Sequence, residues 1–312
     1  MENPMGKPDP IFVDDAFRFN WRLKDHAIKR RERILPFPWY GGKFSHLKWL
    51  LPLLPKCYHY VEPFAGSGAV LLNRDPSPLE TYNDMNGDVV NFYRVLRDRP
   101  RDLIRALRLT PYSREDYVRA IYDEESTDPV EKARRFFVVA TSTFTANVSG
   151  ATIGQWSRSN KNSNCGMAAS VSRFTGHVED LSRIAERLIC VQIENRPAID
   201  VITRYDTPDT FFYCDPPYVK STRVDKDVYA FEMEEDEHRR LADVLNHISG
   251  RAAVSGYDCP LYDEIFPADR WKKYYAEPKS GGAVRSGDKR QEVLWMNYNT
   301  QPIEERQILL PM

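Results

Sequence analysis

The tetrapeptide Asp215-Pro216-Pro217-Tyr218 is the segment of this 312-residue chain whose residue types define a chemistry most narrowly. It follows the apolar run 210–214, which is typical of a buried strand. An Asp before proline is pushed to an extended backbone, and the two prolines fix φ and have no N–H groups. The strand exit is therefore stiff, and it offers two acceptors, the Asp215 carboxylate and the Pro216 carbonyl.

Two acceptors at a rigid strand exit suit the activation of an exocyclic amine. The lone pair of such an amine is delocalised into its ring, so the nitrogen is a poor nucleophile. Acceptors that bind both N–H groups favour a pyramidal nitrogen that can attack a methyl group. Tyr218 provides a ring face for stacking the base, an interaction worth about 1–3 kcal/mol. The alternative is a proline-rich turn in which Asp215 only accepts hydrogen bonds from backbone donors.

A glycine-containing turn, Glu62-Pro-Phe-Ala-Gly-Ser-Gly, follows the predicted strand 58–61. Gly66 and Gly68 allow a ligand to approach the backbone closely. Asp84 lies 16 residues after Gly68, at the end of a second predicted strand, where a carboxylate can accept from both ribose hydroxyls of an adenosine. The chain has no GxxxxGK[ST] motif, which disfavours a triphosphate ligand. S-adenosylmethionine satisfies both observations.

Composition excludes several other classes. The chain has a net charge of −1, so it has no global signature of nucleic-acid binding. Its five cysteines include no CxxC pair and its six histidines no HExxH motif, which predicts neither a disulfide framework nor a metal site. We find no membrane-spanning segment and no secretion signal, and expect a cytoplasmic, DNA-associated protein.

The distribution of charge is more informative than its sum. From Lys132 to Val178 the sequence contains no Asp or Glu. Such a stretch, in a chain with slightly more acids than bases, predicts a surface for polyanions, although an acid-poor loop can also arise by chance. The basic residues of this stretch include Lys132, Arg134, Arg135, Arg158, Lys161 and Arg173.

Hydrophobic periodicity predicts alternating strands and helices that stop near residue 100 and resume near 188. Residues 101–138 are predicted to be helical, and residues 141–176 to form loops with a hairpin. An inserted domain that interrupts one sheet explains this order better than two tandem domains. The predicted strands are 58–61, 79–82, 188–193, 210–214, 252–255, 271–275 and 293–298, and further helices are a short one within 45–55, one that Asn86 caps, and 236–249.

The sequence resembles the Dam-type DNA adenine-N6 methyltransferases, which have the alpha order of motifs. The resemblance rests on PWYGGK (38–43), VEPFAGSG (61–68), YNDMNGD (82–88) and YCDPPY (213–218), with weaker similarity at 255–258 and 280–298. It implies that Asp215, Pro216, Pro217 and Tyr218 are catalytic. It also implies that S-adenosylmethionine is held by Trp39, Tyr40, Lys43, Glu62, Phe64, Gly66, Gly68 and Asp84.

The resemblance implies an α/β fold, with a Rossmann-like seven-stranded methyltransferase sheet and an inserted, mostly helical target-recognition domain. We assign 1–34 to an N-terminal extension, 35–100 and 187–312 to the catalytic domain, and 101–186 to the insert. Double-stranded DNA is the expected partner, and a cognate restriction endonuclease would accompany a restriction–modification role. The expected DNA contacts are Arg158, Lys161, Arg173, Arg285, Lys289 and Arg290.

The sequence also departs from this family. We do not find in the insert the pattern of the basic, Asn- and Phe-containing hairpin of the GATC-reading members, so the target sequence stays open. The sequence does not indicate the oligomeric state either. Three alternatives to adenine-N6 methylation remain at this point: methylation of cytosine N4, methylation of glutamine or RNA, and a catalytically silent DNA-binding protein with the same fold. Cys214 adjoins the motif, but we interpret it as a core strand residue because no covalent intermediate is required.

Overall fold

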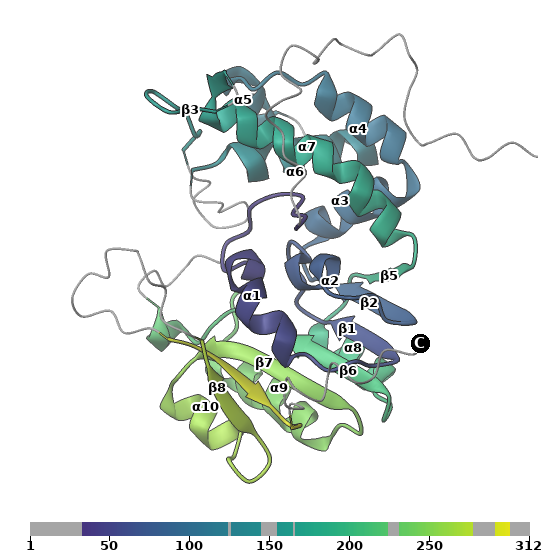
Figure 1. The fold of residues 1–312 in the computed structure, drawn as a ribbon, viewed down its shortest axis with the longest axis vertical. Coiled ribbons are helices and arrows are strands. Elements are labelled where there is room, and N and C mark those ends of the chain that lie inside the picture. The colour runs from purple at the N-terminus through teal and green to yellow at the C-terminus, as the bar shows by residue number, and fades with distance from the viewer. Residues whose placement is uncertain are drawn as a thin grey trace, which may run out of the picture. The chain divides into compact units, whose positions relative to one another are not determined.

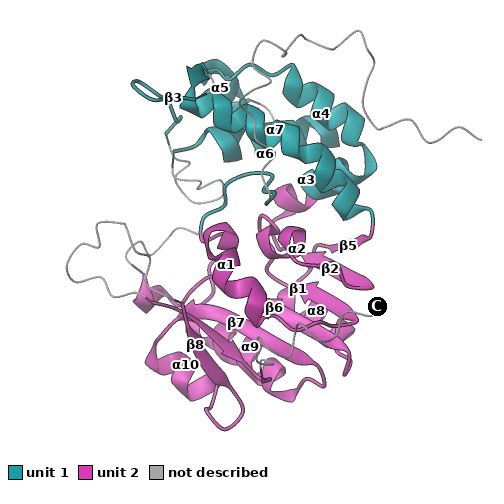
Figure 2. Cartoon of the chain, viewed as in Figure 1, with its two compact units in different colours: residues 1–40, 91–148, 154–189 teal, residues 41–90, 149–153, 190–312 magenta. Residues whose placement is uncertain are grey.

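The computed structural model describes residues 33–123, 126–144, 155–164, 166–223, 231–276 and 291–299. Most of the predicted N-terminal extension, residues 1–32, lies outside this part of the chain. The chain divides into two compact units (Figure 2). Unit 1 comprises residues 1–40, 91–148 and 154–189, and unit 2 comprises 41–90, 149–153 and 190–312. In the part of the chain that the structure describes, no helix is apolar over a length that would cross a bilayer.

Unit 2 is built around a seven-stranded sheet, which confirms the predicted fold class (Figure 1). The strand order is β5-β2-β1-β6-β7-β9-β8, and all strands run parallel except β9, which is antiparallel to both of its neighbours. The strands are β1 (His59–Glu62), β2 (Leu79–Asn83), β5 (Val191–Glu194), β6 (Thr210–Cys214), β7 (Arg251–Tyr257), β8 (Lys272–Tyr275) and β9 (Glu292–Met296).

Helices cover both faces of this sheet (Figure 1). On one face, Val61, Phe212 and Val254 of the central strands pack against three helices in a single apolar cluster. These helices are α8 (Ala198–Tyr205), α9 (Glu235–His247) and α10 (Pro260–Ile265). The opposite face carries α1 (Leu47–Leu50) and α2 (Ala69–Asn73). The 3₁₀ helices η3 (Lys43–His46) and η4 (Leu51–Leu53) flank α1 in the chain and pack against it. Burial on both faces explains why the central strands read as nearly continuous apolar runs.

The strand order contains a topological switch point. The chain proceeds from β1 to β2 and β5 on one side, and then returns to β6 on the other side of β1. In open parallel sheets, ligands bind at the carboxyl ends of the strands beside such a reversal. The carboxyl ends of β1 and β6 are therefore the positions where a site is expected.

Unit 1 is helical. It contains most of α3 (Gly87–Asp98), together with α4 (Pro100–Arg108), α5 (Arg114–Tyr122), α6 (Pro129–Ser142) and α7 (Ala169–Leu188). Helix α6 packs against α4, α5 and α7. Aromatic contacts fill its core, for example the stacked rings of Phe92 and Phe137 with centroids 5.9 Å apart. Asn86 accepts a hydrogen bond from the Asp88 backbone N–H, which confirms it as the predicted cap of α3.

The prediction of loops throughout 141–176 was wrong, because α7 begins at Ala169. The Ser- and Gly-rich composition of this segment hid a helical pattern in which Phe174, Val178 and Leu181 are buried on one side. Tertiary packing of these residues outweighs their neighbours' weak helix propensity. The predicted hairpin is present: β3 (Ser163–Asn164) pairs antiparallel with β4 (Met167–Ala168). Strand β5 starts at Val191 rather than 188, because Leu188 still belongs to α7.

We expect Gly250→Ala to destabilise unit 2. A Cβ at Gly250 would lie 2.7 Å from the carbonyl oxygen of Thr210 and 2.9 Å from that of Thr207, and backbone atoms cannot move aside easily. The expected loss is about 1–3 kcal/mol of unfolding free energy, measured by chemical denaturation. Gly87→Ala is the matched control, since its nearest neighbour would be 3.9 Å away and alanine favours the start of α3. An equal loss in both variants would contradict the steric explanation.

Candidate active site

The register of the central strands brings three of the sequence motifs together at one edge of the sheet. Val61 pairs with Phe212 across β1 and β6, and Glu62 pairs with Tyr82 across β1 and β2. The glycine-containing turn after β1, Asp84 after β2 and Asp215 after β6 therefore all leave the sheet at the same end. This juxtaposition is what a ligand-binding edge of a parallel sheet requires.

Asp215 lies directly after β6, and its side chain is only 17% exposed. The ammonium group of Lys43 lies 2.7 Å from Asp215 Oδ1 and also donates to the Gly41 carbonyl, 2.9 Å away. Burial raises the pKa of Asp215 to about 6, Lys43 counteracts this rise, and the nearby Glu292 carboxylate adds to it. At neutral pH the Asp215 carboxylate is thus mainly ionised, which is the form that accepts hydrogen bonds from an amine.

The structure adds Glu292, which the sequence did not single out. Glu292 begins β9, and its carboxylate accepts a hydrogen bond of 2.6 Å from the Tyr218 hydroxyl. The same carboxylate lies 3.3 Å from Lys43 Nζ and 3.7 Å from His46 Nε2. Despite its burial, the pKa of Glu292 is lowered, with Lys43 and His46 as the main favourable charges. Lys43 therefore lies between two buried carboxylates.

Tyr218 is buried and held on several sides. Besides its bond to Glu292, its ring packs edge-on against the Tyr257 ring, with centroids 4.8 Å apart. Lys43 Nζ lies 5.0 Å from the centroid of the Tyr218 ring. The orientation of this ring is consequently set by β7, β9 and η3 in addition to the two prolines before it.

The turn after β1 is organised by Asp84. Gly66 and Gly68 have positive φ angles of 50° and 58°, which explains why glycine occupies both positions. The Gly66 N–H donates to Asp84 Oδ2 and the Asn86 N–H donates to Oδ1, both at 2.8 Å. Burial raises the pKa of Asp84, and these two backbone N–H groups oppose the rise. Each carboxylate oxygen retains a second lone pair for a hydroxyl donor.

The remaining residues assigned by resemblance lie in different surroundings. Glu62 is buried and accepts a hydrogen bond of 2.6 Å from the Tyr60 hydroxyl, and burial raises its pKa to about 8. Phe64 is partly buried and packs against the apolar cluster of the sheet. Trp39 and Tyr40 belong to unit 1, where the centroid of the Trp39 ring lies 5.9 Å from the centroid of the Phe37 ring. Their assignment to the cofactor stays a prediction.

Cys214 does not provide a nucleophile. It is fully buried in β6, and its burial raises the pKa of its thiol far above the physiological range. A thiol that stays protonated is a weak nucleophile, so the interpretation of Cys214 as a core residue is consistent with its environment.

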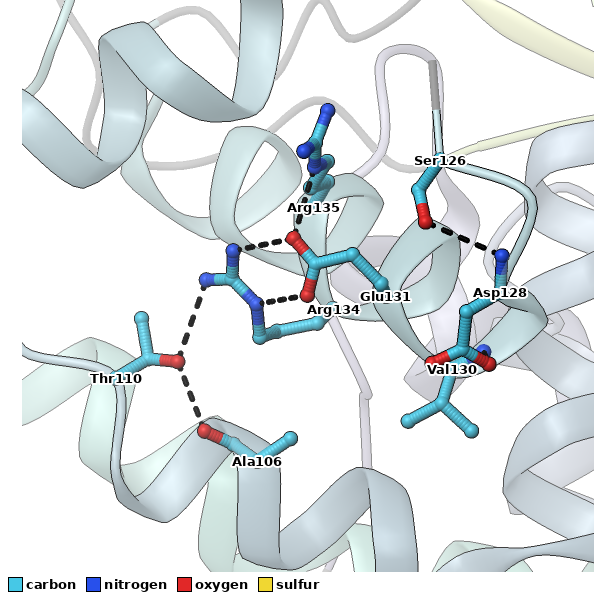
Figure 3. Close-up of polar contacts among 8 residues, drawn as sticks. All are labelled: Ala106, Thr110, Ser126, Asp128, Val130, Glu131, Arg134 and Arg135. Atoms are coloured by element: carbon cyan, nitrogen blue, oxygen red, sulfur yellow. Dashed lines mark hydrogen bonds and ion pairs between the residues drawn. The ribbon is translucent and has the colours of Figure 1, made fainter. Parts of the chain in front are cut away.

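In the fold, part of the positive charge of the acid-free stretch (132–178) is neutralised by a neighbouring acid. Glu131, the residue immediately before it, binds both Nε and Nη2 of Arg134 at 2.7 Å and Nε of Arg135 at 2.8 Å (Figure 3). The Arg134 guanidinium also contacts the hydroxyl of Thr110 at 3.4 Å. Two of the six basic residues are thus engaged in an ion-pair cluster on α6, which weakens their attraction for a polyanion.

Three predicted DNA contacts fall within the described residues. Arg158, Lys161 and Arg173 are exposed, and Arg173 donates to Ser157 Oγ at 3.3 Å. Close to them in the sequence lies Trp156, and the Arg114 guanidinium is 5.0 Å from the centroid of its ring. The other three predicted contacts, Arg285, Lys289 and Arg290, lie outside the described residues.

The family relationship of the chain is defined by comparison with known proteins. The family model for D12 class N6 adenine-specific DNA methyltransferases matches residues 39–276. The type II methyltransferase M1.LlaDCHI of Lactococcus lactis is 26% identical over 289 residues, which cover 86% of this chain and 98% of that protein.

Two further relatives match shorter segments. The DNA adenine methylase of Vibrio cholerae is 41% identical over 21% of this chain and 24% of its own length. The DNA N-6-adenine-methyltransferase of Escherichia phage P1 is 33% identical over 27% of this chain and 12% of its own length. The extent of the family match decides the reaction: this chain belongs to the D12 class N6 adenine-specific DNA methyltransferases, and it methylates adenine N6 in DNA.

Proposed function

We propose that the turn Pro63–Gly68 and Asp84 bind S-adenosylmethionine, with Asp84 accepting from the ribose hydroxyls. The positive φ of Gly66 and Gly68 brings backbone rather than side chains to the ligand position, and the carboxylate beside the turn supplies acceptors for a diol. When bound, this cofactor supplies an electrophilic methyl group on a sulfonium. Aromatic rings favour such a cation, which supports Trp39 and Tyr40 as further contacts.

The observation that carries the catalytic proposal is the buried Asp215 carboxylate at the exit of β6, beside Lys43. Asp215 and the Pro216 carbonyl accept the two N6 hydrogens of adenine, and the Tyr218 ring stacks on the base. As the N6 nitrogen gains a methyl group, it becomes cationic and releases one proton. The ionised Asp215 carboxylate is placed to stabilise this positive charge and to take up the proton before it passes to solvent.

The adenine of a duplex must leave the base stack before its amine can meet Asp215, and flipping it out costs a few kcal/mol. We propose that the helical unit contributes the phosphate and base contacts that hold the duplex during this step. Exposed Arg158, Lys161 and Arg173 support this assignment, and Arg114 with Trp156 extends it. Arg285, Lys289 and Arg290 remain predicted contacts in the catalytic unit. The name of the Lactococcus relative supports a type II role with a cognate restriction endonuclease.

Expression in a host that lacks DNA methylation tests the reaction and its target together. We expect N6-methyladenine at one short recurring sequence when the host DNA is sequenced for modified bases. The Asp215→Ala variant, expressed at the same level, is the control and should leave the DNA unmodified. Methylation confined to cytosine N4 would contradict the adenine assignment.

Asp215→Asn should lower the rate of methyl transfer by about 10²–10⁴-fold, because the amide is a weaker acceptor and cannot take up a proton. Affinity for S-adenosylmethionine, measured by calorimetry, should change little. Asp243→Asn on the exposed surface of α9 is the matched control and should keep full activity. Equal losses of cofactor binding and methyl transfer in Asp215→Asn would show that Asp215 has a structural role instead.

DNA affinity should fall steeply with salt, because phosphate contacts release counterions. Replacing Arg158 or Lys161 with Gln should reduce the slope of log affinity against log salt by about one unit each. Arg119→Gln is the control: this exposed arginine is already paired with Glu115 at 2.6 Å, and its loss should leave the slope unchanged. The same slope in all variants, measured by fluorescence anisotropy, would exclude Arg158 and Lys161 as phosphate contacts.

A further inference from the structure

We propose that Glu292 is a positioning residue for methyl transfer: it fixes the Tyr218 ring and shares Lys43, so that Asp215 keeps an acceptor for the adenine amine. This inference rests on the proposed role of Asp215. Glu292 lies in β9, 77 residues beyond Asp215 in the sequence, and only the folding of the chain brings it close to the site.

The tether to Tyr218 is short and buried. The Tyr218 hydroxyl donates to Glu292 Oε1 at 2.6 Å, and the Glu292 side chain is 8% exposed. Glu292 pairs with Tyr257 in the β7–β9 ladder, and the Tyr257 ring packs edge-on against Tyr218. A carboxylate acceptor and a neighbouring ring therefore hold the Tyr218 ring at both its hydroxyl and its edge, as a stacking surface for a base requires.

The second role of Glu292 concerns charge. Asp215 and Glu292 share one ammonium group, with Lys43 Nζ at 2.7 Å from Asp215 and 3.3 Å from Glu292. An ammonium bound to Asp215 alone would keep that carboxylate ionised, but it would also occupy Asp215 Oδ1 as a strong competitor for the amine hydrogens. The Glu292 carboxylate offers Lys43 a second partner and weakens this competition.

His46 gives the site a further basic group, with Nε2 at 3.7 Å from Glu292 Oε2. Titratable groups that interact electrostatically with Asp215 or Glu292 come from several of the elements around them. These groups are Lys43 and His46 of η3, Glu62 of β1, Tyr213 and Cys214 of β6, Tyr218 after β6, and Tyr262 of α10.

The test is the pH dependence of single-turnover methyl transfer by the full-length protein, with Glu292→Gln as the variant. The rate of the unaltered protein should decline below pH about 6, because burial raises the pKa of Asp215 to that value and protonation removes its acceptor. Glutamine keeps an acceptor for Tyr218 but removes the negative charge that raises the pKa of Asp215. The decline should therefore move to lower pH by about one unit, while the plateau rate falls about tenfold because Lys43 binds Asp215 alone.

Two further variants separate the tether from the charge. Tyr218→Phe keeps the charge of Glu292 but removes the hydroxyl hydrogen bond that lowers the pKa of Asp215. Its plateau rate should therefore fall, and its decline should move to higher pH, opposite to that of Glu292→Gln. Glu292→Asp also keeps the charge and tests the reach of the side chain if Glu292→Gln does not fold. Glu292→Asp should lower the plateau rate without changing the pH at which the rate declines.

The possible failures are distinguishable. A lower plateau rate in Glu292→Gln, with the rate declining at the same pH as in the unaltered protein, would overturn the proposal. The loss of a merely structural residue would have this effect. Wild-type behaviour of Glu292→Gln, or a full rate in Glu292→Asp, would overturn it as well. Failure of the underlying role of Asp215 would appear separately, as full activity in Asp215→Asn.

Discussion

The site depends on a single buried ammonium group that lies between two carboxylates. Without Lys43, the negative charges of Asp215 and Glu292 would share a poorly solvated region with less compensation, and the pKa of both carboxyl groups would be higher. With Lys43 present, the pKa of Asp215 stays near 6 and that of Glu292 below its usual value. Lys43 thereby maintains a buried carboxylate that is ionised yet still basic, which is the combination required of an acceptor for an aromatic amine.

The sheet supplies the rigidity that this arrangement needs. Asp215 leaves the sheet from β6, Glu292 starts β9 and Lys43 belongs to η3, so the three charged groups are held by separate elements. Strand β7 lies between β6 and β9 and adds Tyr257 against the Tyr218 ring. The antiparallel β9 is essential to this geometry: because it runs opposite to β7, its first residue rather than its last lies at the edge where the parallel strands end.

Much of this molecule could be predicted from local sequence. Buried central strands have apolar runs, and the motifs at Gly66, Gly68, Asp84 and Asp215 lie at strand exits, where chain geometry restricts which residues fit. Helix α7 was missed because its first residues are helical through burial of Phe174 rather than through propensity. The pairing of Arg134 and Arg135 with Glu131 is local, at helical spacings of three and four residues, and the role of the acid-free stretch in DNA binding stays a prediction.

The local sequence indicates methylation of an exocyclic amine, because Asp215-Pro216-Pro217-Tyr218 is stiff and rich in acceptors through its covalent structure alone. It leaves the target base open, and the family match assigns adenine N6. The charges that surround Asp215 depend instead on the fold. Glu292 is one of many acidic residues along the chain, and nothing near it in the sequence marks it as a partner of Tyr218 and Lys43. Its role follows from the reversal of β9, since strand pairing joins residues across distances at which local sequence carries no information.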